Sequence, residues 1–384
     1  MRSQRGRGLG RRLGQALALA LLGWAVSCSP AAAPAPQPAA APARATSAPP
    51  AAPPAAATSA PAAASQPAPA SASAPTSAPQ RESVKYGAVV LLAGAPIYLA
   101  SDRGYFAEEG IDFEFVPFDS GALAIAPTAA GQLEIAQAPL GPAFFNVLSR
   151  GVPLTAIAAL TYSDATLIVR KDWMDSGQVK SVADLRGKRV SLNVEGSAVD
   201  YTLRRTFLHE GVRLDEIEIQ RLANSDLAPA LANGAVDAGG VSDPLPIERA
   251  GLAVRLVKGR DVIGPTTAAV MAAGPSMLAK GEGTIVRFMK GYLKGMRDYE
   301  AVLQPDGRIT DPAAVEIMSR WTHIAPDTVV QTTLSEQVPN GAIDLDDLDN
   351  IQSYWVSDGA VSTPVNLSQF VDSHFAAAAR AQLP

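Results

Sequence analysis

The run from Val89 to Asp119 constrains the fold most, because it reads as a strand, a loop, a helix and a second strand in succession. Val89 to Leu92 is apolar and branched, which predicts a short buried strand. Ala93 to Pro96 is a small-residue loop that a ligand can approach closely, and its proline suits a first helical turn. Ile111 to Val116 alternates like a strand. Open α/β sheets bind ligands at loops of this kind, which follow the carboxyl end of a strand.

The amino terminus has the features of an export signal. Met1 to Arg12 is basic, and Leu13 to Trp24 is apolar but too short to span a bilayer as a mature helix. Ala25 to Cys28 is similar to a lipobox, and Cys28 is the single cysteine of the chain. We therefore predict a lipoprotein signal peptide at residues 1–27 and lipidation of Cys28. The alternatives are an ordinary secreted protein with a stray cysteine and a twin-arginine signal at Arg11-Arg12.

A tether and an acidic folded region are expected to follow the signal peptide. Residues 28–82 consist mainly of Ala, Pro, Ser and Thr, a composition that cannot bury enough apolar surface to fold. The leader holds five arginines and no acid, so its removal would change the net charge from −5 to −10. Such an acidic chain is a poor partner for nucleic acid.

A short pattern occurs twice and indicates two similar α/β lobes. Gly131 to Ala136 and Gly234 to Ala238 each place an acidic residue between apolar ones, after a predicted helix and before a strand-end loop. Two β-branched or apolar runs, Thr166 to Val169 and Thr266 to Ala272, are predicted to cross between the lobes as a two-segment hinge. The predicted lobes are residues 83–165 with 273–384, and residues 166–272.

The run P-I-Y-L-A-S-D-R-G-Y-F-A-E-E-G-I-D-F-E, from Pro96 to Glu114, resembles the opening signature of substrate-binding proteins of ABC importers. The subfamily takes up nitrate, sulfonates, taurine and thiamine pyrimidines, and the resemblance extends from Val84 to Ala379. It implies a periplasmic-binding-protein type II fold with a ligand cleft between the lobes. It also implies a monomeric extracytoplasmic lipoprotein, anchored in the membrane by lipid on Cys28, that serves a permease and its ATPase. Glu134 departs from the family's usual Asp.

Candidate ligand contacts lie in the loops at predicted strand ends and helix starts. They are Gly94, Ala95, Pro96, Phe118, Asp119, Ser120, Gly121, Gln137, Pro139, Leu140, Tyr162, Glu195, Gly196, Ser197, Ala198, Asp243 and Pro244. Gly196 to Ala198 would offer free amide groups at a helix start, although Ser197 can equally be an ordinary helix cap. Asp243-Pro244 can be a simple turn. Tyr162 and Phe118 can stack on a ligand or belong to the core.

The residue types in these loops favour a neutral or aromatic heterocycle, because few cationic side chains occur there. Backbone amides alone can hold an anion, so nitrate, sulfonate and taurine remain alternatives. Catalytic motifs are absent, and His209, His323 and His374 are too scattered to suggest zinc. We therefore expect no enzyme activity, no cofactor and no metal.

The sequence predicts a solute-binding lipoprotein that delivers a thiamine pyrimidine precursor or a riboflavin-like compound to an ABC permease. One alternative is an anion binder of the same family. A second is an enzyme of pyrimidine synthesis, against which stand the lipobox and the missing cysteine-rich motif. The third is a ligand-sensing lipoprotein without its own permease.

Overall fold

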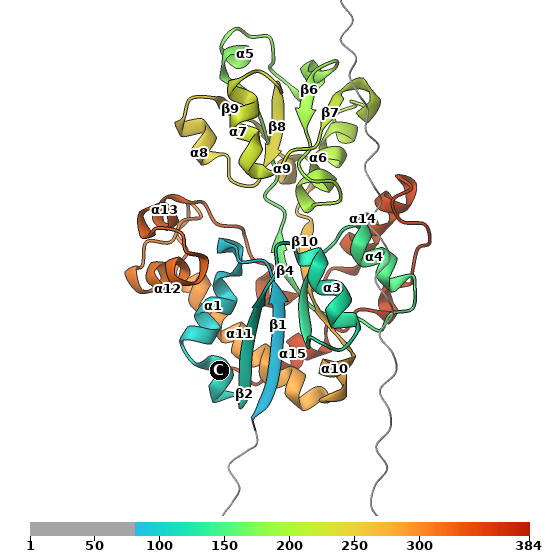
Figure 1. Cartoon of the computed structure of the whole chain (residues 1–384), viewed down its shortest axis with the longest axis vertical. Helices are drawn as coiled ribbons and strands as arrows, with labels where there is room; N and C mark the ends of the chain where they lie inside the picture. The colour runs from blue at the N-terminus through green and yellow to red at the C-terminus, as the bar shows by residue number, and fades with distance from the viewer. Residues whose placement is uncertain (1–80) are drawn as a thin grey trace, which may run out of the picture. The chain divides into compact units, whose positions relative to one another are not determined.

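The computed structural model describes residues 81–384, shown in Figure 1. The predicted signal peptide, Cys28 and all but the last two residues of the tether lie outside this range. Across residues 81–384, none of the helices has the length and apolar character needed to cross a membrane.

The first of two five-stranded sheets has the order β2-β1-β3-β10-β4. Its strands are β1 (Glu82–Ala88), β2 (Ile111–Pro117), β3 (Ile135–Pro139), β4 (Thr155–Tyr162) and β10 (Thr267–Ala273). β1 runs parallel to β2 and β3, whereas β10 runs antiparallel to β3 and β4. The carboxyl ends of β1, β3 and β4 therefore meet at one edge of this sheet, beside the start of β10.

The second sheet repeats this arrangement in the order β7-β6-β8-β5-β9. Its strands are β5 (Thr166–Arg170), β6 (Arg189–Ser191), β7 (Glu218–Gln220), β8 (Ala238–Val241) and β9 (Ala253–Lys258). β6 is parallel to β7 and β8, and β5 is antiparallel to β8 and β9. In each sheet the antiparallel strand, β10 or β5, is the one that arrives from the other sheet.

The acidic residue of the repeated sequence pattern has the same role in both sheets. The Glu134 carboxylate accepts a hydrogen bond from the backbone N–H of Lys85 in β1 at 2.9 Å. The Asp237 carboxylate accepts one from the backbone N–H of Arg189 in β6, also at 2.9 Å. The longer Glu134 side chain thus replaces the aspartate, which explains why this departure from the family pattern is tolerated.

The chain crosses between the sheets twice, at residues 163–165 and 264–266. We define the first lobe as the first sheet with its helices, and the second lobe as the second sheet with its helices. Our sequence boundary assigned residues 267–272 to the second lobe, whereas β10 belongs to the first sheet because its backbone pairs with β3 and β4. Hydrophobicity alone does not reveal with which strands a crossing segment pairs.

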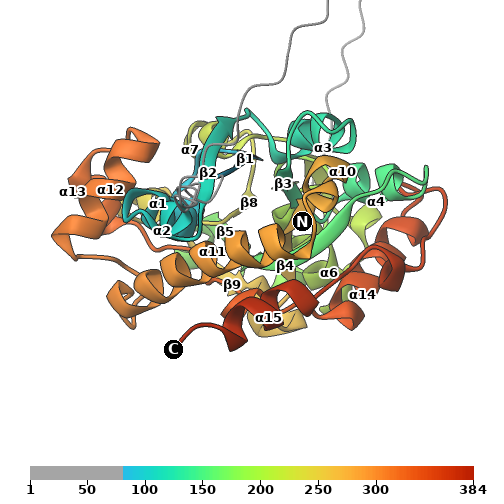
Figure 2. The ribbon, with the colours of Figure 1, turned by 90° about the horizontal axis from the view of Figure 1, so that it is seen from below.

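Helices cover both faces of the first sheet, as Figures 1 and 2 show. One face carries α1 (Ala95–Asp102), α2 (Tyr105–Glu108), α11 (Glu282–Val302) and α15 (His374–Ala381). The other face carries α3 (Gly121–Ala129), α4 (Pro142–Leu148) and α14 (Leu345–Ser357). The remaining helices of this lobe are α10 (Pro275–Ala279), α12 (Pro312–Thr322) and α13 (Pro326–Gln331). The second lobe contains α5 (Lys171–Asp175), α6 (Ala198–His209), α7 (Asn224–Ala232), α8 (Leu245–Arg249) and α9 (Gly259–Ile263).

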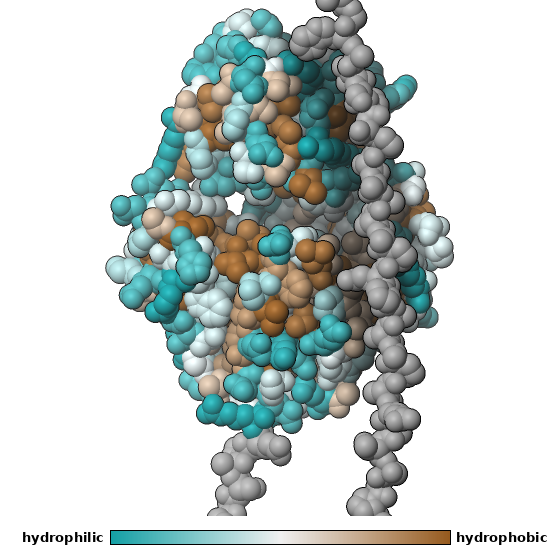
Figure 3. Space-filling view, in the orientation of Figure 1, coloured by the Kyte–Doolittle hydropathy of each residue, from teal (hydrophilic) through white to brown (hydrophobic). Residues whose placement is uncertain are grey.

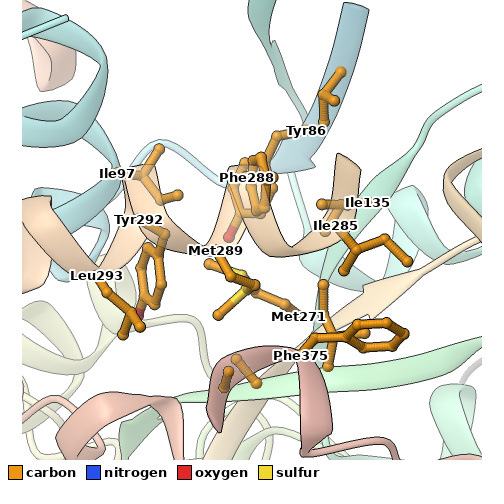
Figure 4. Packing of buried hydrophobic residues seen from close by; sticks show 14 of the residues in the cluster. Tyr86, Ile97, Ile135, Met271, Ile285, Phe288, Met289, Tyr292, Leu293 and Phe375 are labelled. Atoms are coloured by element: carbon orange, nitrogen blue, oxygen red, sulfur yellow. The ribbon is translucent and has the colours of Figure 1, made fainter. Parts of the chain in front are cut away.

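Strand β10 has an almost entirely apolar sequence because both of its faces are buried. Met271 packs in the core with Tyr86 of β1 and Phe288 of α11, the cluster shown in Figure 4. Val270 and Ala272 point to the opposite face and belong to the core that contains Trp355 of α14. A strand that is buried on both faces needs apolar residues at every position rather than at alternate ones.

One strand prediction is wrong. Val89 to Leu92 is not a buried strand: β1 ends at Ala88, and Leu91 is 49% exposed. The true strand is the preceding segment, in which Val84, Tyr86 and Ala88 are buried at alternate positions. The apolar run instead forms a loop at residues 89–91 and the start of a short 3-10 helix, Leu92–Gly94, which leads into α1.

Candidate ligand-binding site

A cavity of about 750 Å³ lies where the carboxyl-end edges of the two sheets face each other. The first lobe contributes the loops after β1, β2, β3 and β4 and the start of β10, together with Ser335 and Ala360. The second lobe contributes the loop between β6 and α6, with Ser242 after β8. Figure 3 shows hydrophobic residues gathered on the first lobe, the lower one in this view, where it borders the opening toward the second lobe. Leu91 and Val194, 49% and 54% exposed, line the cavity from opposite lobes.

The structure brings most of the sequence-predicted site residues to this cavity. Those that line it are Asp119, Ser120, Gly121, Gln137, Pro139, Tyr162, Glu195, Gly196, Ser197 and Ala198. They come from both lobes, although they are far apart in the sequence. Their meeting is a consequence of the strand polarity of the two sheets, which directs these loops to the same space.

Seven of the predicted residues lie elsewhere. Gly94 and Pro96 line a smaller cavity of about 20 Å³, which shares Gln137 with the large one. Ala95 and Leu140 are buried in hydrophobic cores, and Phe118 packs beside the small core around Leu133. Asp243 accepts a hydrogen bond from the backbone of Leu245 at 3.1 Å, as in a turn. Pro244 lines a separate polar cavity of about 170 Å³.

The loop before α6 differs from our expectation of free amide groups. The Gly196 N–H donates to the Asp200 carboxylate at 2.9 Å, and the Ser197 hydroxyl accepts from the Asp200 N–H at 3.1 Å. Both groups are therefore used to cap the helix. The structure thus bears out the alternative of an ordinary helix cap at Ser197. Asp200 stands three positions after Ser197, the spacing of a capping box, but its side chain accepts from the amide of Gly196. The start of α6, at Ala198 and Val199, still lines the cavity.

Replacing Ser197 by alanine is expected to lower the free energy of unfolding of the ligand-free protein by about 1 kcal/mol, because the Asp200 amide loses its acceptor. Urea denaturation measures this loss. Ser197→Thr keeps the oxygen atom and should retain most of the stability. Equal losses for the two variants would show that the cap contributes nothing and that another contact of the Ser197 side chain is responsible.

A buried charge network links this loop to the first lobe. The Asp200 side chain is fully buried and accepts hydrogen bonds from Arg204 Nε at 2.8 Å and Arg221 Nη1 at 2.6 Å. Arg204 Nη1 also donates to Asp358, at the end of α14, at 2.9 Å. Burial lowers the pKa of Arg204, but hydrogen bonding to Asp200 outweighs it and the net pKa is raised. Arg204 therefore stays charged and joins α6 of the second lobe to α14 of the first.

Backbone contact between the lobes occurs at two glycines. A Cβ atom added to Gly141, which precedes α4, would lie 2.2 Å from the carbonyl oxygen of Gly196. A Cβ atom on Gly196 would lie 2.9 Å from Pro142. Gly196 also has a φ of 74°, a conformation that favours glycine. Glycine at both positions allows the two loops to meet beside the cavity.

The charged residues lining the cavity are all acidic. Asp119, Asp164 and Glu195 line it, and no Lys, Arg or His does among the residues that the structure describes. Asp164 was not among our predicted contacts, although it follows the same strand as Tyr162. The rule that placed Tyr162 at the site, a loop at the carboxyl end of a strand, applies equally to Asp164.

The family model for proteins described as NMT1/THI5 like matches residues 93–306. The chain belongs to the NMT1/THI5-like family. The matched region contains the whole second lobe and all of the cavity-lining residues except Val89, Leu91, Ser335 and Ala360. The predicted family resemblance is thereby confirmed.

Among relatives of this NMT1/THI5-like chain, a Brucella abortus protein provisionally named a binding protein is 28% identical over 148 residues. That match spans 38% of this chain and 43% of the relative, so this chain covers less than half of the relative's length. A Haemophilus influenzae protein provisionally named a thiamine biosynthesis protein is 28% identical over 145 residues, 38% of this chain and 44% of that protein. The riboflavin-binding protein RibY of Chloroflexus aurantiacus is 22% identical over 207 residues, 53% of this chain and 58% of RibY.

Solved structures establish the fold of the family member. The alkanesulfonate-binding protein SsuA of Xanthomonas axonopodis, bound to MOPS, matches 77% of this chain and 99% of its own with a TM-score of 0.58 and 17% identity. The nitrate-binding protein NrtA of Synechocystis matches 79% of this chain and 90% of its own, with a TM-score of 0.61 and 12% identity. The desulfurization enzyme DszB matches 79% of this chain and 99% of its own, with a TM-score of 0.56 and 15% identity. The predicted two-lobed periplasmic-binding-protein fold is confirmed, and this fold carries both binding proteins and an enzyme.

The family member offers no evident metal centre in the part of the chain that the structure describes. There, no group of three or more His, Cys, Asp or Glu side chains is arranged to hold a metal ion. The chemistry available in the cavity is hydrogen bonding, apolar contact and negative charge.

Proposed function

We propose that this chain is the solute-binding component of an ABC importer and that it captures a small molecule in the cavity between its lobes. The observation that carries the proposal is a cavity of about 750 Å³ built by strand-end loops of both lobes, which are joined by two crossings. Such a site allows a ligand to bind one lobe and to favour the arrangement in which the second lobe also contacts it.

The lining of the cavity favours a neutral or cationic heterocycle over an anion. An oxyanion such as nitrate or a sulfonate would meet Asp119, Asp164 and Glu195 without a lining Lys, Arg or His among residues 81–384. Apolar side chains such as Leu91, Pro139 and Val194 suit the faces of a ring instead. The thiamine- and riboflavin-related names of two relatives agree with this class of ligand.

The remaining parts of the proposal concern the setting in which the protein works. We propose that the chain is exported, anchored through lipid on Cys28, and carried on the tether of residues 28–82 as a monomer. The ligand-bound form would dock on a membrane permease driven by an ATPase. We further propose that the chain binds its ligand without chemical change, since none of the catalytic motifs that we sought occurs in the sequence.

A ligand panel tests the proposed function. The purified full-length protein is heated with an aminopyrimidine, riboflavin, taurine or nitrate, and positive results are measured again by titration calorimetry. A ligand at 100 times its Kd should raise the free energy of unfolding by about 2.7 kcal/mol. We expect stabilisation by a heterocycle and none by the anions. Stabilisation by taurine or nitrate alone would reject the heterocycle, and consumption of a ligand would reject the absence of chemistry.

A further inference from the structure

Asp164 occupies a position that no other cavity-lining carboxylate shares. It lies in the first crossing between the lobes, at residues 163–165, directly after β4. It lines both the large cavity and the neighbouring polar cavity of about 170 Å³, and Ser242 of the second lobe lines the same two spaces. Asp164 is therefore a half-buried carboxylate at the hinge, whereas Asp119 and Glu195 are exposed.

The carboxylate of Asp164 has no ion-pair partner within 4 Å among residues 81–384, although cations lie near it. One of these cations, Arg260 of α9, is already paired with Glu336, and its guanidinium carbon lies 5.9 Å from the ring centre of Tyr162. Lys258 lines the polar cavity of about 170 Å³ but not the large one. Its side chain is exposed, so solvent screens its charge. Neither Arg260 nor Lys258 therefore forms an ion pair with the Asp164 carboxylate.

Burial affects the protonation of Asp164. Desolvation raises the pKa of the carboxyl group above its ordinary value, and the negative charge of Glu336 raises it further. A hydrogen bond with Ser335 and the positive charges of Arg260 and Lys258 lower the pKa, but by less, so the net shift is upward. A partly desolvated carboxylate that lacks a full set of donors gains strongly from a new hydrogen-bond donor, because bonds to charged groups are stronger than bonds between neutral ones.

We propose that Asp164 is a specificity-determining residue that accepts hydrogen bonds from an amino or ammonium group of the ligand. This inference rests on the proposed function of ligand capture in the large cavity. The ligand then enters with its donor group toward the hinge and its apolar face against Pro139 and Val194. A ligand whose corresponding atom can only accept hydrogen bonds is rejected, because two acceptors would face each other in a partly buried place.

The experiment compares two probes that differ in this one group, 4-amino-2-methylpyrimidine and 4-methoxy-2-methylpyrimidine. Their affinities are measured by titration calorimetry for the full-length wild type, Asp164→Asn and the control Asp261→Asn. Asp261 is an exposed aspartate in α9 that lines none of the three cavities described above, and its replacement changes the net charge equally. Thermal unfolding of each ligand-free variant shows whether it is folded.

We expect the wild type and Asp261→Asn to prefer the amino probe by about 10- to 100-fold, and Asp164→Asn to lose that preference while unfolding at an unchanged temperature. An unchanged preference in Asp164→Asn would overturn the inference, as would a wild type that binds both probes equally or neither. The proposed function has a separate outcome. If the wild type binds riboflavin, taurine or nitrate but neither pyrimidine, ligand capture stands and the role of Asp164 falls.

Discussion

Replacing Arg204 by alanine is expected to lower the free energy of unfolding by about 3–5 kcal/mol, because it leaves the buried Asp200 carboxylate with an incomplete set of partners. Only 7% of the Arg204 side chain is exposed, and Asp200 is fully buried. Arg221 still contacts Asp200 in the variant, but it lies at the edge of the network and is 31% exposed. The bond to Asp358 and the contact of the guanidinium with the Trp355 ring, 5.7 Å from its centre, are also lost.

Urea denaturation measures this effect, and a second Arg–Asp pair serves as the matched control. Arg213 pairs with Asp215 on the surface, with both side chains more than 60% exposed. Since solvent screens such pairs, Arg213→Ala should leave the unfolding midpoint unchanged. If Arg204→Ala unfolded at the same urea concentration as Arg213→Ala, the network would not contribute to stability, and its role in joining α6 to α14 would be rejected.

Replacing Gly141 by alanine is expected to weaken ligand binding by about 10- to 100-fold. This loss is expected if only about 1–10% of the variant molecules have the lobes close enough for both to contact the ligand. The new methyl group would lie 2.2 Å from the Gly196 carbonyl oxygen, a backbone atom of the opposite lobe that has no side-chain freedom to move away. The lobes must separate, or the loop before α6 must shift. Gly141 has a φ of −123°, so alanine itself fits its backbone without strain.

Affinity and stability measured on the same samples separate this effect from misfolding. Gly141→Ala should change the free energy of unfolding by less than about 1 kcal/mol, because its clash is relieved by separation of the lobes. The control is Gly283→Ala in α11, where an added Cβ atom has nothing within 4 Å and no effect on binding is expected. Unchanged affinity in Gly141→Ala would show that the loops at Gly141 and Gly196 need not meet for binding.

The two-lobed arrangement was predictable because local patterns encode it. Glu134 and Asp237 mark equivalent places in the two sheets, and each accepts a hydrogen bond from a backbone N–H of the neighbouring strand. The apolar run in β10 signals a strand buried on both faces. The loops at Ser120, Tyr162 and Ser197 were assigned to the site because they follow strands or begin helices, and strand polarity then brings them to one edge.

The details of the site depend on contacts that local patterns do not encode. Arg204 and Asp358 are 154 positions apart, and no sequence pattern indicates that they bond. Ala95 and Leu140 were chosen because they lie in predicted strand-end loops, yet each side chain belongs to a hydrophobic core. The strand-end rule could have placed Asp164 in the cavity, but its position beside a second cavity follows only from the three-dimensional arrangement.

Titration of the full-length protein with the ligand panel, followed by native mass spectrometry, tests the central claim most directly. The account predicts one heterocycle bound per wild-type chain, and much less of the same adduct on Gly141→Ala at equal ligand concentration. That pair of results would indicate that the ligand is held between the lobes rather than on one of them. The account would be contradicted if no compound bound to the wild type, or if Gly141→Ala carried the same amount of ligand as the wild type.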